Sequence, residues 1–429
     1  MSAADRSAEV VPVAVVGAGA AGLWAAREAA AAGERVVLLE KTQRTGTKVL
    51  ASGGTRCNLT TTLEPDEAAG LFGAEGERFL LGAFWGLPPS EVRRRFEAWG
   101  VPTREAPLEK VFPASDRARD VRDALEREAL AAGVELRLGA PVTGVVRDGE
   151  LWRVHFAEGD DLLATKLLLC PGGQSYPKTG TTGDGYRWLR ELRLPVVEPV
   201  PALAPLVSPA EWPAELAGIA PQEVDVRLVS SKGRTLRRRS RPVVFSHRGL
   251  SGPGAMDVSE PVARAAARGE REPLWVHLDL VPGWDRADLR EALVTAAGEK
   301  GAPRLSRILP VDLPKRLLER VASQAGADEP NPRCAGISKG QRHEWVEALK
   351  ELRVPVHDTE GYDKAEVTAG GLALKAVQPD TLEVRGRPGL YVFGELLDLQ
   401  GPIGGLNFQA AFATAELAAA DAVRALHAG

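Results

Sequence analysis

The stretch VAVVGAGAAGLWAAREAAAAGERVVLLEK, residues 13–41, decides the fold. Its first residues, Val13–Val16, are small and apolar and suit a buried parallel strand. They lead into a G-x-G-x-x-G pattern made by Gly17, Gly19 and Gly22. In this pattern the first glycine permits a tight turn, the second lets the backbone approach a pyrophosphate, and the third lets a helix pack closely on the strand.

The rest of the stretch completes a strand–helix–strand unit. Ala20–Ala32 predicts a helix whose free N–H groups face a phosphate, and Gly33 suits its carboxyl end. Arg35–Leu39 predicts the second strand. Glu40, 23 residues after Gly17, is placed to accept hydrogen bonds from ribose hydroxyls and would repel a 2′-phosphate. We therefore predict a dinucleotide other than NADP at this site.

The C-terminal stretch RPGLYVFGELLDLQGPIGGLNFQAAFATAELAAADAVRAL, from Arg387, favours FAD over NAD. Leu390–Phe393 predicts a strand, and Gly394 and Glu395 follow it directly. A glycine-rich loop then leads to a helix of about 20 residues that begins near Leu406. An acid at this point suits the ribityl chain of a flavin, and the positive end of the helix suits the N1/O2 edge of the isoalloxazine.

Two internal segments extend the cofactor site. KVLASGGTRCNLTT, from Lys48, is loop-like and predicts backbone and polar groups beside the flavin. Cys57 in this loop has no thiol nearby and is interpreted as a small buried residue. ATKLLLCPGGQSYPKTGTTGDGYRWLREL, from Ala164, predicts a strand at Lys166–Leu169, a glycine turn at Gly172 and then a helix, as expected where the chain re-enters the nucleotide domain.

These motifs together with FSHRGLSGP and AEVTAGGLAL occur in the order found in a known family. The sequence resembles the BaiN-type NAD(P)/FAD-dependent oxidoreductases, also called aminoacetone-oxidase-like flavoproteins. The resemblance runs from about Val13 to Ala419. It implies an α/β fold: a two-dinucleotide-binding-type, Rossmann-like FAD domain with an inserted β-barrel-like domain and a small helical domain.

The sequence departs from this family at two positions close to where the flavin ring is expected. Thr55 stands where the family usually has a third glycine, and Leu406 where it usually has an aromatic residue. The candidate cofactor-binding residues are Gly17, Gly19, Ala20, Ala21, Gly22, Glu40, Lys41, Lys48, Ser52, Gly53, Gly54, Arg56, Asn58, Gly172, Gly394, Glu395, Gly404, Gly405, Leu406 and Asn407.

The cofactor motifs divide the chain into a split domain and an insert. We expect the FAD-binding domain at 1–190 and 363–429, with the inserted domain at 191–362. Short apolar or alternating runs make the insert β-rich at about 191–280, and helical spacing interrupted by prolines makes it helical at about 284–352.

Composition limits the possible partners and the compartment. The 429 residues carry 54 basic and 58 acidic side chains, a formal net charge of −4, which does not suit a protein that binds polyanions in bulk. Only three cysteines are present, far apart in the sequence, so we expect neither a disulfide framework nor a cysteine metal site. No signal peptide or membrane segment is evident, and a cytoplasmic protein is expected.

Flavin chemistry requires few side chains, because the cofactor carries the hydride. His247 and Arg248 in FSHRGLSGP are the candidate catalytic residues, the first as a proton donor or acceptor and the second as a partner for an anionic substrate. The glycines of Thr368–Gly371 are interpreted as positions where backbone approaches the ring or the pyrophosphate.

The favoured function is hydride transfer between FAD and a small organic substrate, with NAD(P)H as a transient electron donor. A flavin-dependent oxidase that uses O₂ on an amine or ketone, a flavoprotein that modifies RNA, and a protein with FAD as a structural element remain alternatives. Flavoproteins that modify tRNA share the glycine turn, and Arg93–Arg95 and Arg237–Arg241 are basic runs. With 42 arginines in the chain, such runs are better explained as solvated faces, and we do not expect a nucleic-acid partner.

Overall fold

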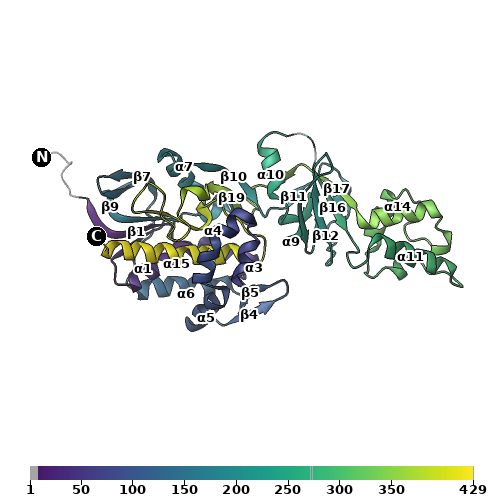
Figure 1. The fold of residues 1–429 in the computed structure, drawn as a ribbon, viewed down its shortest axis with the longest axis horizontal. Coiled ribbons are helices and arrows are strands. Elements are labelled where there is room, and N and C mark those ends of the chain that lie inside the picture. The colour runs from purple at the N-terminus through teal and green to yellow at the C-terminus, as the bar shows by residue number, and fades with distance from the viewer. Residues whose placement is uncertain (1–7, 271, 273, 429) are drawn as a thin grey trace. The chain divides into compact units, whose positions relative to one another are not determined.

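The computed structural model describes residues 8–270, 272 and 274–428. The chain forms two compact units, one from Met1–Pro199 with Glu366–Gly429 and the other from Val200–Ala365 (Figure 1). We call them unit 1 and unit 2. Both boundaries lie further along the chain than expected: unit 2 begins at residue 200 instead of 191 and ends at residue 365 instead of 362. The reason is that β10 (Val196–Ala202), along which the chain leaves unit 1, pairs with β19 (Val367–Leu372), along which it returns.

Unit 1 is built on a seven-stranded sheet with the order β6-β2-β1-β9-β8-β7, in which β20 also pairs with β9. Five of its strands pair in parallel with one another, namely β1, β2, β6, β9 and β20. The other two, β7 and β8, form an antiparallel hairpin. The strands are β1 (Glu9–Val16), β2 (Val36–Leu39), β6 (Glu135–Arg137), β7 (Val142–Asp148), β8 (Leu151–Phe156), β9 (Leu162–Leu169) and β20 (Leu390–Val392). A separate three-stranded sheet contains β3 (Thr60–Thr61), β5 (Lys110–Pro113) and β4 (Thr103–Ala106).

Strand β9 organises this sheet because two strands share one of its edges. Its residues from Leu162 to Leu169 pair with β1 along one edge. On the other edge, Leu162–Ala164 pair with β8, and Leu167–Leu169 pair with β20. The short C-terminal strand is therefore held beside the carboxyl end of β9. As a result, the ends of β2, β1, β9 and β20 all lie at one edge of the sheet.

Helices cover the sheet of unit 1, and α15 lies against α1 (Figure 1). Trp24 on α1 is fully buried, with its ring centroid 4.7 Å from that of Phe412 on α15. Its indole N–H donates to the carboxylate of Glu416 on α15 at 2.7 Å, so a hydrogen bond adds to the apolar contact between the two helices. The helices are α1 (Ala20–Ala31), α2 (Thr47–Thr55), α3 (Pro65–Gly70), α4 (Gly73–Gly86), α5 (Pro89–Ala98), α6 (Ala118–Ala131), α7 (Asp184–Glu191) and α15 (Leu406–His427), with single turns η1 (Pro177–Thr179), η3 (Leu374–Ala376) and η4 (Gly394–Leu396).

Unit 2 contains two four-stranded antiparallel sheets and a group of helices. One sheet has the order β14-β15-β11-β18, and the other has the order β13-β12-β16-β17. The strands are β11 (Leu206–Val207), β12 (Asp225–Val229), β13 (Thr235–Ser240), β14 (Val244–Ser246), β15 (Gly249–Ser251), β16 (Leu274–Asp279), β17 (Leu352–Val356) and β18 (Asp358–Thr359). The helices are α8 (Trp212–Glu215), α9 (Pro253–Met256), α10 (Glu260–Ala267), α11 (Arg286–Gly298), α12 (Leu305–Ile308), α13 (Lys315–Gln324) and α14 (Lys339–Lys350), with the turn η2 (Cys334–Gly336).

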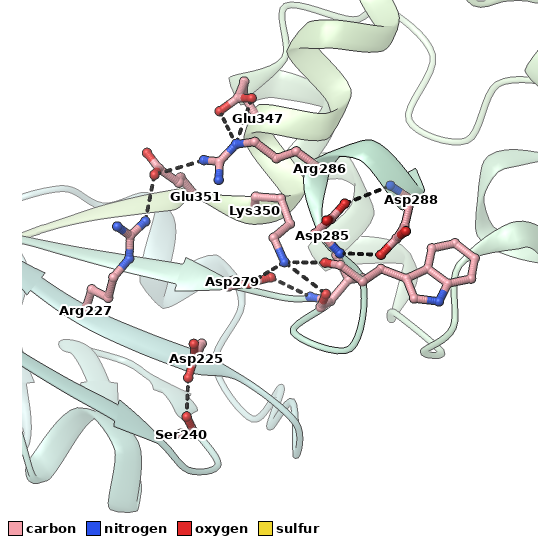
Figure 2. Close-up of polar contacts among 12 residues, drawn as sticks. Asp225, Arg227, Ser240, Asp279, Asp285, Arg286, Asp288, Glu347, Lys350 and Glu351 are labelled. Carbon is pink, nitrogen blue, oxygen red and sulfur yellow. Dashed lines mark hydrogen bonds and ion pairs between the residues drawn. The ribbon is translucent and has the colours of Figure 1, made fainter. Parts of the chain in front are cut away.

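A buried lysine joins the sheet of unit 2 to its helices (Figure 2). Lys350, at the end of α14, is 8% exposed and lies 2.5 Å from the carboxylate of Asp279, at the end of β16. The same ammonium donates to the carbonyl oxygens of Val281 at 3.2 Å and Trp284 at 2.6 Å. Because all three ammonium protons have acceptors, the charge is compensated within the protein. The contact fixes the β16–α11 connection against the α14–β17 connection.

The next residue, Glu351, bridges strand β12 and helix α11 through two arginines (Figure 2). Its carboxylate accepts from Arg227 on β12 at 2.6 Å and from Arg286 on α11 at 3.0 Å. Burial alone would raise the pKa of Glu351, but the hydrogen bond and charge of Arg227 outweigh it and lower that pKa. The acid therefore stays ionised and holds both elements at neutral pH.

We predict that Lys350→Met destabilises unit 2 by about 3–5 kcal/mol, because Asp279 would keep a buried charge without its partner. Urea denaturation followed by circular dichroism measures the change. Lys339→Met is the matched control, since Lys339 is exposed at the start of the same helix. Equal midpoints for the two variants would contradict the role given to the buried ammonium.

Candidate functional site

The candidate site lies where β1, β2, β9 and β20 end, since four of the predicted cofactor segments follow those strands. Gly17 turns the chain out of β1 with φ +105°, and its N–H donates to Leu39 O at 2.8 Å. A Cβ at Gly17 would lie 2.6 Å from Cys170 O, in the segment after β9. Only glycine allows both this conformation and this approach, so Gly17 joins three neighbouring strand ends.

The other two glycines of the turn have different surroundings. A Cβ at Gly22 would lie 1.8 Å from Gly17 O, so Gly22 is required for α1 to pack against the turn. A Cβ at Gly19 would meet no atom of the protein within 4 Å. Gly19 is also the N-cap of α1 and has no side chain to cap the free N–H groups. Internal packing therefore does not explain this glycine, whereas close approach of a pyrophosphate to the start of α1 does.

Glu40 holds the glycine turn from the end of β2. One carboxylate oxygen accepts from the N–H of Ala18 at 3.0 Å, and the other accepts from the N–H and hydroxyl of Thr42 at 2.9 Å. Lys41 points to a different segment, with its ammonium 2.6 Å from both Thr182 and Asp184. Burial would raise the pKa of Asp184, but the hydrogen bonds from Lys41 and Thr182 keep that pKa below its ordinary value.

A polar network connects the segments that follow β9 and β20. Lys48 on α2 donates to Ser175 at 2.5 Å and to the carboxylate of Glu395. Glu395 accepts in addition from Ser175 at 3.1 Å and from the N–H of Thr368 at 2.9 Å. Ser175 and Thr368 are fully buried. Four segments of unit 1 thus meet at one carboxylate, and its charge is matched by the Lys48 ammonium.

Sequence reasoning did not include Ser175 and Thr368 in the cofactor set. Ser175 follows the glycine turn at Gly172, and only the polar character of that loop hinted at it. Thr368 Oγ1 accepts from the N–H of Gln174 at 2.8 Å, a contact across 194 positions of sequence that local patterns do not reveal. Gly172 itself has φ +81°, and a Cβ there would lie 3.1 Å from Thr181.

The segment from Lys48 was expected to be a loop, and this was wrong for its first half. Thr47–Thr55 is α2, interrupted at Ser52, Gly53 and Gly54, where the backbone leaves the helical conformation. Gly53 has φ +55°, Gly54 has φ +65°, and Thr55 follows with φ +69°. The chain therefore makes a left-handed turn in which two positions are glycine and the third is Thr55. A β-branched residue is strained in this left-handed region, where glycine would not be.

The remaining residues of this segment fold against the small sheet. Asn58 accepts from the N–H of Val111 on β5 at 3.1 Å. The guanidinium of Arg56 is exposed and lies 4.9 Å from the ring centroid of Phe112. Asn58 therefore has a structural partner already, whereas Arg56 makes a cation–π contact at the surface.

The predicted glycine positions near the C-terminus make close contacts within unit 1. A Cβ at Gly405 would lie 2.1 Å from Thr60 O, and a Cβ at Gly394 would lie 3.2 Å from Ala21 on α1. Gly404 has nothing closer than 4.0 Å, which is the side chain of Leu406. Ala20 and Leu406 are the first residues of α1 and α15, and Leu406 is buried. The Asn407 amide exchanges two hydrogen bonds of 2.9 Å with the backbone of Gly401 and so closes this loop.

The glycines of Thr368–Gly371 make close contacts with the protein's own backbone, and their approach to the ring or the pyrophosphate stays a prediction. A Cβ at Gly370 would lie 2.6 Å from Glu198 O, and one at Gly371 would lie 2.4 Å from Leu396 O. They therefore make room for the protein's own backbone. Cys57 is fully buried, as expected, and burial raises the pKa of its thiol to about 12, so it stays protonated.

The candidate catalytic residues His247 and Arg248 lie in unit 2. They form the turn between β14 and β15, and both are exposed. The N–H of Arg248 donates to the hydroxyl of Ser246 at 3.3 Å, which shapes the turn. The cofactor segments all belong to unit 1, and a catalytic role for this turn stays a prediction.

Both basic runs carry carboxylate partners. Arg93 pairs with Glu105 at 2.6 Å, and its neighbours Arg94 and Arg95 pair with other acids. On β13, Arg237 pairs with Glu260 at 3.1 Å, and the next two arginines also pair with carboxylates. Within residues 8–270, 272 and 274–428, no group of three or more His, Cys, Asp or Glu side chains could hold a metal ion. In the same residues no helix has the length and apolar character needed to cross a membrane.

A glycine turn at the end of a parallel strand, beside an acid on the next strand, defines a Rossmann-like dinucleotide-binding protein. A family model described as the HI0933-like protein Rossmann domain matches residues 11–421, and the chain belongs to this family. The resemblance inferred from the motifs is confirmed. The protein is an FAD-dependent oxidoreductase, and its unit 1 contains the Rossmann-like cofactor fold.

Relatives match along almost the whole chain. A ribosomal RNA dihydrouridine synthase from Escherichia coli is 30% identical over 415 residues, covering 96% of this chain and 98% of the relative. A 3-dehydro-bile acid delta(4,6)-reductase from Clostridium scindens is 29% identical and covers 95% and 97%. A solved 3-ketosteroid-delta4-(5alpha)-dehydrogenase from Rhodococcus jostii is 15% identical with a TM-score of 0.51, covering 98% of both chains, and shows the shared fold.

We predict that Gly19→Val yields a folded protein without FAD, because a Cβ at this position meets no protein atom within 4 Å, whereas the added side chain would obstruct the pyrophosphate. The ratio of flavin absorbance to protein absorbance, with circular dichroism, measures both properties. Gly70→Val is the control, since a Cβ at this exposed glycine also meets nothing within 4 Å. A yellow Gly19→Val protein with one FAD per chain would exclude this position from the phosphate site.

We predict that Thr55→Gly stabilises unit 1 by about 1 kcal/mol, because glycine relieves the strain of the left-handed backbone. The melting temperature of the holoenzyme should rise by about 2 °C. Thr62→Gly, at an exposed position without positive φ, should instead lower it. A lower melting temperature for Thr55→Gly would mean that the threonine side chain contributes more than its strain costs.

Proposed function

We propose that this oxidoreductase reduces a carbon–carbon double bond conjugated to a carbonyl group, with NAD(P)H as electron donor. Bound FAD supplies hydride chemistry. The names of two full-length relatives support the proposal. Dihydrouridine is formed from uridine, and a delta(4,6)-reductase acts on a 3-oxo compound, so both names describe hydrogen added across a double bond that a carbonyl activates.

The observation that carries the cofactor assignment is the position of Gly19, which is open in front of α1 and required by no contact within the protein. Around it we assign Gly17, Gly22 and Glu40 to the pyrophosphate and ribose side of FAD. The other predicted cofactor residues lie at the neighbouring strand ends, in α2 and the segment that follows it, and at the start of α15. Glu395 and Lys48 form an ion pair there, and we assign them to the ribityl side.

A small organic substrate is the first candidate. The basic runs that would suit a nucleic acid are neutralised by carboxylates: Arg237 by Glu260 and Arg93 by Glu105. We propose His247 and Arg248 as the polar groups that meet such a substrate. Both side chains are exposed, and the Arg248 side chain makes no ion pair among the described residues.

Uridine in RNA is the second candidate. Ribosomal RNA dihydrouridine synthases from Escherichia coli and Haemophilus influenzae match at 30% and 28% identity over nearly their full lengths. The reaction class is the same for both candidates, so the substrate distinguishes them and the cofactor chemistry does not.

We predict that anaerobic titration of the holoenzyme with NADH or NADPH bleaches the flavin band. Adding 2-cyclohexenone as a conjugated probe, or a ribosomal RNA transcript, should then restore the band without O₂. Mass spectrometry should find a product heavier by two hydrogen atoms. Restoration by cyclohexenone supports the small-molecule form, and restoration by RNA with dihydrouridine formation supports the second candidate.

Three outcomes would overturn the proposal. A flavin that stays oxidised with both NADH and NADPH would exclude NAD(P)H as the electron donor. A reduced flavin reoxidised only by O₂ would indicate an oxidase. A flavin that no reductant bleaches would leave FAD as a structural element.

A further inference from the structure

An open pocket of about 420 Å³, which we call the cavity, lies at the surface of unit 1, away from the strand ends that carry the cofactor motifs. It is bordered by Arg387 and Pro388, which precede β20, and by Arg147 and Trp152 of the β7–β8 hairpin. The cofactor residues Gly394 and Glu395 instead follow β20. The cavity and the proposed FAD site therefore belong to opposite ends of that strand. Its volume falls within the range of small-molecule sites.

Three arginines line the cavity, and two of them are held in place by backbone carbonyls. Arg147 donates to Gly149 O at 2.8 Å and to Pro388 O at 2.7 Å, with its guanidinium 5.4 Å from the ring centroid of Trp152. Its carboxylate neighbour is Glu150, at 3.4 Å with a fully exposed side chain, which adds little to the electrostatics. The guanidinium group of Arg147 is thus held in one orientation, and its positive charge is not neutralised.

The other two arginines enter from separate segments. Arg387 donates to Leu192 O and Gly386 O, each at 3.1 Å. Arg193 is exposed in the turn after α7, with φ +58°, and its guanidinium makes no ion pair or hydrogen bond among the described residues. Carbonyl oxygens fix an arginine without cancelling its charge, so the three guanidinium groups keep donors for a ligand.

The charge of the lining identifies the ligand. With three arginines and one acid, Glu191, the lining carries a net charge of +2, and Glu191 itself faces Arg187 at 3.8 Å. A dianionic phosphate monoester matches this charge and offers three terminal oxygens to the guanidinium groups. A phosphodiester or a single carboxylate carries only one charge.

We propose that this cavity is a second ligand site, separate from the FAD site, that binds the phosphate monoester group of a small molecule. The arginines belong to the β7–β8 hairpin, the α7–β10 turn and the loop before β20, so a bound phosphate links three segments of unit 1. Free inorganic phosphate and a phosphorylated metabolite share this chemistry, and the two are distinguished by affinity.

Isothermal titration of the FAD-loaded protein with AMP, and separately with inorganic phosphate, in a buffer free of phosphate tests the site. We expect one AMP per chain and at least about tenfold weaker binding in Arg193→Gln and in Arg387→Gln, because each removes a charged donor. Arg193 is exposed, so this variant keeps the fold. Arg385→Gln is the matched control, because Arg385 lies on the same loop but outside the cavity lining. The flavin spectrum should not change in any variant.

Weaker binding of phosphate than of AMP supports a metabolite site, and equal binding supports a site for free phosphate. Three results would overturn the proposal. The first is the absence of binding by either probe at millimolar concentration. The second is unchanged affinity in both arginine variants. The third is preferential binding of succinate, or of an oligonucleotide without terminal phosphate, over AMP.

Discussion

The close packing of the glycine turn against the end of β9 is the constraint on which unit 1 depends. Gly17 approaches the backbone of Cys170, and Gly22 approaches the carbonyl of Gly17, at distances that no side chain permits. This packing fixes where α1 starts relative to two strands. Because β9 also holds β20 beside its carboxyl end, the same packing sets the position of Gly394 and Glu395. A feature of six residues thus places segments from both ends of the chain.

Carboxylates then hold the loops that these strand ends carry. Glu40 accepts from the backbone of Ala18 in the glycine turn, and Glu395 is bound by Lys48 and by the backbone of Thr368. Each acid follows a parallel strand and reaches toward a different loop. The assigned ligand-binding residues are therefore also the residues that shape the site, and a change in either acid alters loop geometry as well as direct contacts with FAD.

The sequence was sufficient to predict the parallel unit around β1 because its signals are local. Strand, glycine turn, helix and acid follow one another within residues 13–41, and each has a recognisable composition. The same holds for α15, which begins at Leu406 as expected. The segment from Lys48 was harder, because its two glycines favour a loop, whereas the four residues before Ser52 continue a helix that packs against α6. Ser175 and Thr368 were missed because their partners are distant in sequence.

Arginine usage illustrates why sequence runs and three-dimensional clusters differ. The runs at Arg93–Arg95 and Arg237–Arg239 are conspicuous in sequence, yet every member has a carboxylate partner, so they add little net field. Arg147, Arg193 and Arg387 are isolated in sequence but border one cavity, where backbone carbonyls hold Arg147 and Arg387 and the carboxylate beside Arg147, that of Glu150, is fully exposed. Net positive potential therefore arises where arginines lack acids, and the spacing of arginines along the chain does not indicate it. In a chain with 42 arginines and 58 acids, the position of the acids decides where an anion can bind.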